Sequence, residues 1–171
     1  WALFAQQHKD AYLYLHTDRW GHLDGINLIP VLKAVGAPED RIRWVNSSQM
    51  RAGSPAETLA AIMRSANVLL LASRGEGFGI PVIEAQACGT PVIVTDWTAQ
   101  PELVKDHGYI AEGQLDWDEM QESWWKIPSV ESILEGLTLN YIATQEGSID
   151  RAALAKKMYE YDADFVYLTK W

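Results

Sequence analysis

The sequence predicts an α/β fold, specifically a three-layer Rossmann-like domain with a mostly parallel sheet. Short β-rich runs alternate with longer helix-like stretches, and four of the five β-rich runs are almost entirely apolar. Alternating strands and helices are typical of a parallel sheet with helices on its faces, and continuous apolar strands are typical of a sheet covered on both sides. The expected strands are residues 12–16, 42–45, 67–72, 91–95 and 108–111.

Helix signals lie between and after these strands. Ser54, Pro55 and Glu57 supply an N-cap hydroxyl, a first-turn proline and an early acid, so a helix is expected to begin there. Three further helices are expected: residues 81–88 ending at Gly89, residues 130–144 after Ser129, and residues 149–159 capped by Ser148.

The stretch 115–127 is unusual because it contains three tryptophans in an acidic setting. Trp117, Met120 and Trp124 are spaced three and four residues apart, which would place them on one face of a helix. Three large apolar groups are costly to leave in water. We therefore expect this face to pack on another part of a larger parent protein.

Composition limits the class of protein. The 171 residues are 48% hydrophobic, enough for one domain with a substantial core, so a single domain over 1–171 is expected. The net charge is −9, and residues 112–171 hold twelve acidic against five basic residues. Nucleic acid is therefore not an expected partner, because such surfaces need a basic stripe.

The sequence also argues against a membrane segment, a secreted protein and a metal site. No apolar run reaches 18 residues, so neither a transmembrane segment nor a signal peptide is expected. A single cysteine, Cys88, fits a reducing compartment and hence a cytoplasmic protein. The four histidines lack metal-ligand spacing, so no metal is predicted.

The most informative segment is the glycine-rich turn after the third expected strand. Its glycines allow a ligand to approach the backbone closely, and the helix beginning near Ile80 directs free N–H groups at the same place. A phosphate is the natural occupant. Glu76 and Glu84 would repel a phosphate unless they contact hydroxyl groups. A phosphate flanked by hydroxyl-rich groups describes a nucleotide sugar.

At these residues the chain resembles the family 4 glycosyltransferases of GT-B fold, whose C-terminal domain has two glutamates separated by seven residues around a Gly-Phe-Gly turn. The resemblance extends over about residues 4–171 and includes residues 66–73 before the turn and 100–104 after it. It implies the donor-binding half of a retaining enzyme that transfers a hexose from a nucleoside-diphosphate sugar without a metal or other cofactor.

The resemblance also assigns roles by position. Glu76 would be the catalytic residue that contacts the transferred sugar, and Glu84 would bind the ribose hydroxyls. The loop after the second strand, residues 45–49, would lie against the base. The backbone amides of four residues would line the sugar and diphosphate, with two more residues nearby: Gly77, Phe78, Gly79 and Ile80, then Pro81 and Val82.

Two features of the family are expected to lie outside this sequence. The basic pair that neutralises the diphosphate would precede Trp1, and so would the first strand of the domain. The chain is therefore expected to be a fragment that also lacks an N-terminal acceptor domain, and to be inactive alone.

Two alternatives remain. The first is a dinucleotide-binding domain using Gly75, Gly77 and the acid Asp96, but Ile80 occupies its third glycine position and Glu76 would face the pyrophosphate. The second is a module that binds a nucleotide sugar or a protein partner without catalysis. The acidic, tryptophan-rich stretch 115–127 favours that second alternative.

Overall fold

The computed structural model describes residues 1–22 and 25–168, with the backbone alone described at residues 47, 49 and 161–168. The chain forms two compact units that meet in sequence at Ala56 and Glu57. Helices and strands alternate in both units. The strands that form at the five expected positions pair in parallel with their neighbours, which confirms the predicted α/β class. The single domain expected over 1–171 stays a prediction.

The first unit contains a two-stranded parallel sheet. β1 (Leu13–Leu15) pairs with β2 (Ile42–Trp44), with Leu13 opposite Ile42. The helical elements are α1 (Ala2–Gln7), α2 (Leu28–Ala34), the 3-10 turn η1 (Glu39–Arg41) and α3 (Ser47–Ala52). The Arg41 guanidinium donates to the carbonyl oxygens of Ala5 and His8, at 2.9 and 2.8 Å, which attaches η1 to the end of α1.

The second unit contains the larger sheet, with strand order β3–β4–β5 and all pairs parallel. All four residues of the central strand are buried, which explains its unbroken apolar run. The elements of this part are α4 (Ala56–Ser65), β3 (Leu69–Leu71), α5 (Ile80–Ala87), β4 (Val92–Thr95), α6 (Gln100–Leu103) and β5 (Tyr109–Ala111).

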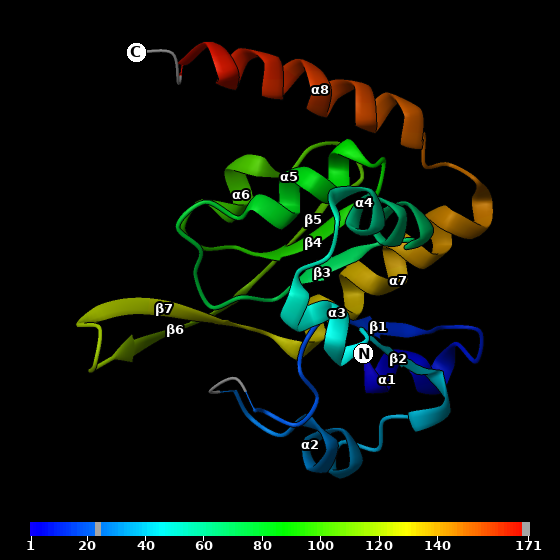
Figure 1. Ribbon diagram of the computed structural model, residues 1–171, viewed down its shortest axis with the longest axis vertical. Coiled ribbons are helices and arrows are strands. Elements are labelled where there is room, and N and C mark those ends of the chain that lie inside the picture. The colour runs from blue at the N-terminus through cyan, green and yellow to red at the C-terminus, as the bar shows by residue number, and fades with distance from the viewer. Residues whose placement is uncertain (23–24, 169–171) are drawn as a thin grey trace. The chain divides into compact units, whose positions relative to one another are not determined.

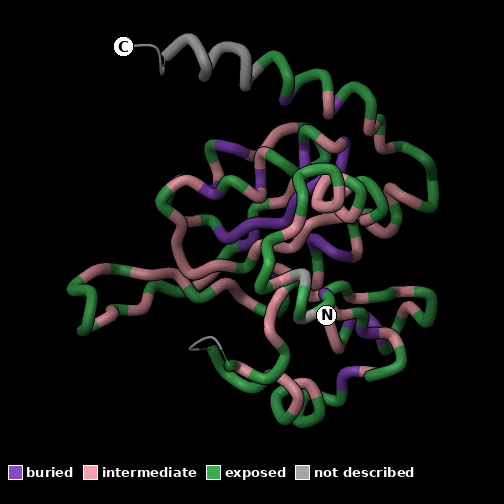
Figure 2. Tube along the Cα trace, in the orientation of Figure 1, coloured by how far each residue is buried: buried purple, intermediate pink, exposed green. Residues whose placement is uncertain are grey.

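Helices cover both faces of this sheet. α5 packs on β3 and β4, α7 (Val130–Glu146) packs on β4 and β5, and Figure 1 shows these two helices on opposite sides of the strands. α8 (Arg151–Leu168) packs against α5. Figure 2 shows the buried residues gathered along β4 and the helices beside it. One cluster of the core contains Val82, Ala85, Val92, Val94 and Leu103.

The expected helix over 115–127 is wrong. β6 (Gly113–Asp118) and β7 (Ser123–Pro128) form an antiparallel hairpin in which Trp117 lies opposite Trp124. Their rings make an edge-to-face contact with centroids 5.2 Å apart. The spacing that fits a helix face therefore reflects two strands joined by a turn, and Glu122 in that turn has a φ of +48°.

The exposure of the three apolar side chains agrees with their expected surface position. Trp117, Met120 and Trp124 are 47%, 96% and 55% exposed, so none is buried in the core of its own unit. Their packing against another part of a larger protein stays a prediction.

Two helix ends match the sequence signals and a third does not. Ser129 caps α7 by accepting the N–H of Ser132 at 2.9 Å, and Gly89 follows α5 with a φ of +74°. The predicted cap Ser148 is wrong, because its hydroxyl donates to the Ala143 carbonyl. Asp150 instead accepts the N–H of Ala153, and α8 begins at Arg151.

Candidate functional site

Three segments meet at the carboxyl edge of the β3–β4–β5 sheet. Parallel strands end at a common edge, and ligands of open α/β sheets bind there. β3 leads into the loop 72–79, β4 leads into the turn 96–99, and β5 leads directly into the β6–β7 hairpin. The residues that the sequence predicts for the site belong to the first of these segments and to the helix that follows it.

Gly79 makes the transition from this loop to α5. It is the N-cap residue, and its φ of +92° is a left-handed value that side chains other than glycine disfavour. Among the described residues, the N–H groups of Gly77, Gly79 and Ile80 have no protein partner. Unpaired donors at the start of a helix, together with its dipole, form an anion-binding surface.

The two predicted glutamates lie on different elements. Glu76 is half-buried in the loop, and its Cβ lies 4.0 Å from the position that a Cβ on Gly79 would occupy. Glu84 is exposed on α5. Neither carboxylate has a hydrogen-bond or ion-pair partner in the described part of the chain. Both can therefore accept hydrogen bonds from a ligand.

The remaining predicted residues differ in what their side chains do. Gly77 is exposed, and an added Cβ would meet no atom within 4 Å. Ile80 is 60% exposed, and Pro81 takes an early position of α5. Phe78 and Val82 belong to or pack on the core, with Val82 fully buried. The side chains of Phe78 and Val82 therefore stabilise the loop and the helix by packing in the core.

Two buried glutamines anchor the site, and the sequence analysis missed them. Gln86 on α5 donates to the carbonyls of Val82 and Leu103, and its oxygen accepts the Lys105 N–H at 2.8 Å. Gln100 accepts from the Thr95 N–H and donates to the Ser73 carbonyl, at 3.3 Å each. The signal for Gln86 was an amide between Ala85 and Ala87 in a mostly apolar helix, where a buried polar group needs partners.

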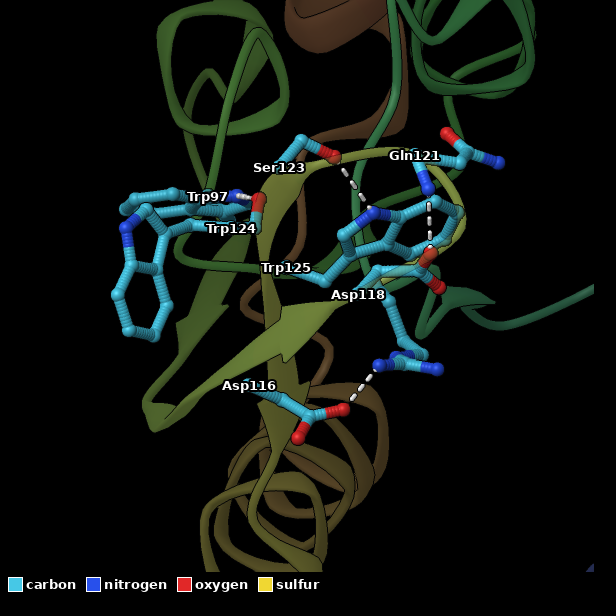
Figure 3. Close-up of polar contacts among 8 residues, drawn as sticks. Trp97, Asp116, Asp118, Gln121, Ser123, Trp124 and Trp125 are labelled. Carbon is cyan, nitrogen blue, oxygen red and sulfur yellow. Dashed lines mark hydrogen bonds and ion pairs between the residues drawn. The ribbon is translucent and has the colours of Figure 1, made fainter.

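The hairpin supports the loop from one side. The Lys126 N–H donates to the Arg74 carbonyl at 2.9 Å, so β7 is hydrogen-bonded to the loop backbone. The Arg74 guanidinium forms an ion pair with Asp116 and lies 5.0 Å from the Trp125 ring centroid. Figure 3 shows Asp116 and Trp125 on adjacent strands of the hairpin. The loop is therefore joined to the hairpin through both its backbone and a side chain.

The turn after β4 supports the loop from another side. Asp96 pairs with the Lys126 ammonium at 2.9 Å, so its carboxylate is engaged, in contrast to the free ribose acid required by the dinucleotide alternative. The Trp97 indole N–H donates to the Trp124 carbonyl at 3.1 Å (Figure 3). The Thr98 hydroxyl accepts the Glu76 N–H at 2.9 Å.

Two other features lie apart from this site. A cavity of about 120 Å³ is lined by seven residues, none of them in the loop or in α5: Asn67, Pro91, Ala143, Thr144, Gly147, Ile149 and Arg151. Among the side chains that the structure describes, which exclude those of residues 161–168, no group of three or more from histidine, cysteine or acidic residues could hold a metal ion. Over residues 1–22 and 25–168, no helix has the length and apolar character needed to cross a membrane.

The sequence of this region matches a known family. Residues 46–128 fit the family model described as glycosyl transferases group 1, and this segment contains the loop, α5, the turn after β4 and the hairpin. This segment belongs to the glycosyl transferases group 1 family. The resemblance to GT-B glycosyltransferases is thereby confirmed.

Three curated relatives agree with the family. The O-antigen chain mannosyltransferase B of Escherichia coli is 40% identical over 58 residues, covering 34% of this chain and 15% of the relative. The D-inositol 3-phosphate glycosyltransferase of Segniliparus rotundus is 34% identical over 86 residues, 50% of this chain and 19% of the relative. The MMP alpha-(1->4)-mannosyltransferase of Mycolicibacterium hassiacum is 35% identical over 89 residues, which cover 50% of this chain and 22% of the relative. The chain thus spans less than a quarter of these relatives.

Proposed function

We propose that this chain supplies the donor site of a retaining glycosyltransferase, which binds a nucleoside-diphosphate sugar and transfers its hexose to an acceptor. One observation carries the proposal. Three unpartnered N–H groups at the start of α5 adjoin two unpartnered carboxylates, one before the helix and one on it. The first group suits a phosphate and the second suits hydroxyls, and a nucleotide sugar has both.

The resemblance to family 4 glycosyltransferases supports a separate role for each carboxylate. Glu76 belongs to the loop before the helix and binds hydroxyls of the hexose, which holds the anomeric carbon in position for transfer. Glu84 lies one turn into α5 and binds the ribose hydroxyls. The diphosphate lies between them against the N–H groups of Gly77, Gly79 and Ile80.

Catalysis in this proposal is electrostatic. Negative charge develops on the departing diphosphate, and donors already aimed at that position stabilise it without reorganisation. The backbone amides at the start of α5 are among these hydrogen-bond donors. The basic pair and the acceptor site come from further chain of a longer protein, and no metal or other cofactor takes part. The single Cys88 favours a cytoplasmic setting.

A second candidate is a module that binds a nucleotide sugar or a protein without transferring anything. The exposed Trp117 and Trp124 on the hairpin favour it, because exposed aromatic side chains of this size are frequent at interaction surfaces. Both candidates use the same loop. They differ in whether a donor is consumed.

The deciding experiment uses the longest natural chain that carries these residues. It is incubated with a panel of nucleotide sugars, and release of nucleoside diphosphate is measured with and without a metal chelator. Mannose donors come first, because two of the relatives are named mannosyltransferases. We expect turnover that the chelator does not affect. The product should keep the anomeric configuration of the donor. Absence of turnover with every donor would favour the binding module.

A further inference from the structure

Thr98 has a backbone conformation that its side chain disfavours. Its φ is +54°, and a β-branched residue at such a value is a genuine outlier. Backbone strain of this kind persists only where surrounding contacts hold it, and it concentrates at functional sites. Thr98 is exposed, so packing of its own side chain in the core does not explain the strain.

The contacts of Thr98 lead directly to the proposed donor loop. Its hydroxyl accepts the N–H of Glu76 at 2.9 Å and donates to its neighbour's carbonyl, that of Trp97, at 2.8 Å. The oxygen is therefore fixed in direction by the second bond while it holds Glu76 through the first. A Cβ added to Gly75 would lie 3.7 Å from the Thr98 methyl, so the turn also lies against the loop just before Glu76.

The hairpin in turn holds the Thr98 turn. The Trp97 indole donates to the Trp124 carbonyl, and Lys126 on the same strand pairs with Asp96 (Figure 3 shows Trp97 against Trp124). β7 also contacts the loop directly, because the Lys126 N–H donates to the Arg74 carbonyl. Glu76 is thus reached from the hairpin by two routes, one through Arg74 and one through Trp97 and Thr98.

We infer that Thr98 is a positioning residue for Glu76 and that the β6–β7 hairpin, residues 113–128, fixes this turn against the donor loop. The inference rests on the proposed function, in which Glu76 contacts the transferred sugar. The strained φ of Thr98 is what points its hydroxyl at the Glu76 N–H. The hydroxyl acts on the orientation of the hexose, whereas the nucleotide is held elsewhere, by α5 and Glu84.

The test separates strain from function by replacing Thr98 with glycine in the longest natural chain. Thr98→Gly removes the hydroxyl and relieves the strain, because glycine adopts positive φ freely. We expect a melting temperature equal to or above that of the parent, together with a loss in kcat for hexose transfer of about 3- to 10-fold, the range for one ordinary hydrogen bond. The Kd for nucleoside diphosphate should change by less than about twofold.

Two further variants complete the design. Thr98→Ser keeps the hydroxyl and should restore kcat to within about twofold of the parent. His107→Gly is the matched control, since His107 also has a positive φ, +63°, but lies before β5 at the opposite edge of the sheet. It should leave kcat and nucleotide binding unchanged.

The outcomes distinguish this inference from the proposed function. If the parent turns over a donor but Thr98→Gly keeps full kcat, or Thr98→Ser fails to restore it, the positioning role is overturned and the donor site stands. A parallel loss of melting temperature and nucleotide binding in Thr98→Gly would show a structural role and also overturn the inference. If the parent consumes no nucleotide sugar, both the proposed function and this inference fail.

Discussion

Glu76 and Glu84 contact opposite ends of the donor in the proposed site, and their substitutions should therefore separate. Glu84→Ala removes a charge-assisted bond to the ribose, worth about 1.5–3 kcal/mol, so nucleoside diphosphate should bind about 10- to 150-fold more weakly. Glu76→Ala should leave that affinity nearly intact while lowering turnover, because only orientation of the hexose is lost. Calorimetric titration of nucleoside diphosphate into both variants measures the difference. Equal losses, or a larger loss in Glu76→Ala, would overturn the assigned roles.

Two glycines of the same loop have different reasons to be glycine. A Cβ on Gly77 would meet no protein atom, so Gly77→Ala should change the free energy of unfolding by less than about 0.5 kcal/mol. It should nevertheless weaken donor binding, since the added methyl lies where a ligand approaches the backbone. Gly79→Ala should instead destabilise the fold by about 1–2 kcal/mol, because its φ is +92°. Thermal unfolding and donor titration of both variants test this, and unimpaired donor binding by Gly77→Ala would count against the proposed site.

At the residue scale the sequence offers candidates for the chemistry but does not reveal what supports them. Glu76, Gly79 and Glu84 could be chosen because a glycine-rich turn, a helix start and spaced acids are all local signals. Thr98 could not, because its contact with Glu76 spans 22 residues and depends on where β4 ends beside β3. Long-range hydrogen bonds of this kind are set by tertiary packing, which local periodicity does not report.

At the scale of elements, Gln86 links α5 to the segment after α6. Gln86→Leu fits the apolar surroundings but leaves the Leu103 carbonyl and the Lys105 N–H without this partner, so we expect a loss of about 1–3 kcal/mol in the free energy of unfolding. Denaturant unfolding measures it. Gln145→Leu is the control, because Gln145 is exposed on α7 and its replacement should change stability by less than about 0.5 kcal/mol. Similar values for the two variants would contradict the anchoring role.

The attachment of α8 should depend on pH through Asp106. The Lys157 ammonium, which hydrogen-bonds the Asp106 carboxylate, lowers the pKa of that carboxyl below its ordinary value of 3.8. A pKa lowered in the folded state adds stability above pH 3.8, and that stability is lost as the pH falls through the lowered pKa. Asp106→Asn should therefore melt slightly below the parent at pH 6, and the difference should vanish in strong acid.

The control for this prediction removes an ion pair whose two residues both lie on α8. Glu160→Gln removes the exposed pair with Lys156, 4.0 Å apart, which joins no second element to the helix. Exposed pairs contribute little, so its melting temperature should match the parent at every pH. A difference between Asp106→Asn and the parent that persists unchanged in acid would contradict the assigned linkage.

The elements themselves show where sequence patterns suffice. The five strands were predicted from β-rich runs, four of them almost entirely apolar, and all five are present. The hairpin was predicted as a helix because the spacing of Trp117, Met120 and Trp124 also fits a helical face. The alternation of apolar and acidic residues over Leu115–Asp118 was the competing signal for a strand. Short segments satisfy both periods, and pairing with a second strand decides between them.

At the scale of the whole molecule, the chain is small compared with its relatives. The matched residues make up at most 22% of the three relatives described, so most of the residues that accompany this segment in those proteins have no counterpart in the match. Family membership of residues 46–128 therefore assigns a segment, and transfer remains a property to be tested in a longer chain.

The 171 residues and a longer chain should differ in sugar transfer but not in the ability to bind nucleotide. The purified 171-residue chain should bind nucleoside diphosphate weakly, through the α5 amides and Glu84, and should transfer no sugar. Binding needs only the donor loop and α5, whereas transfer also needs an acceptor held within reach of the anomeric carbon and positive charge on the departing diphosphate. Calorimetry with nucleoside diphosphate and a transfer assay with the same donor panel, run on this chain and on the longest natural chain, measure both properties. Glu84→Ala in the short chain serves as the binding control and should abolish the weak heat signal. Robust transfer by the 171 residues alone would show that the acceptor site and the charges that stabilise the diphosphate lie within this sequence after all.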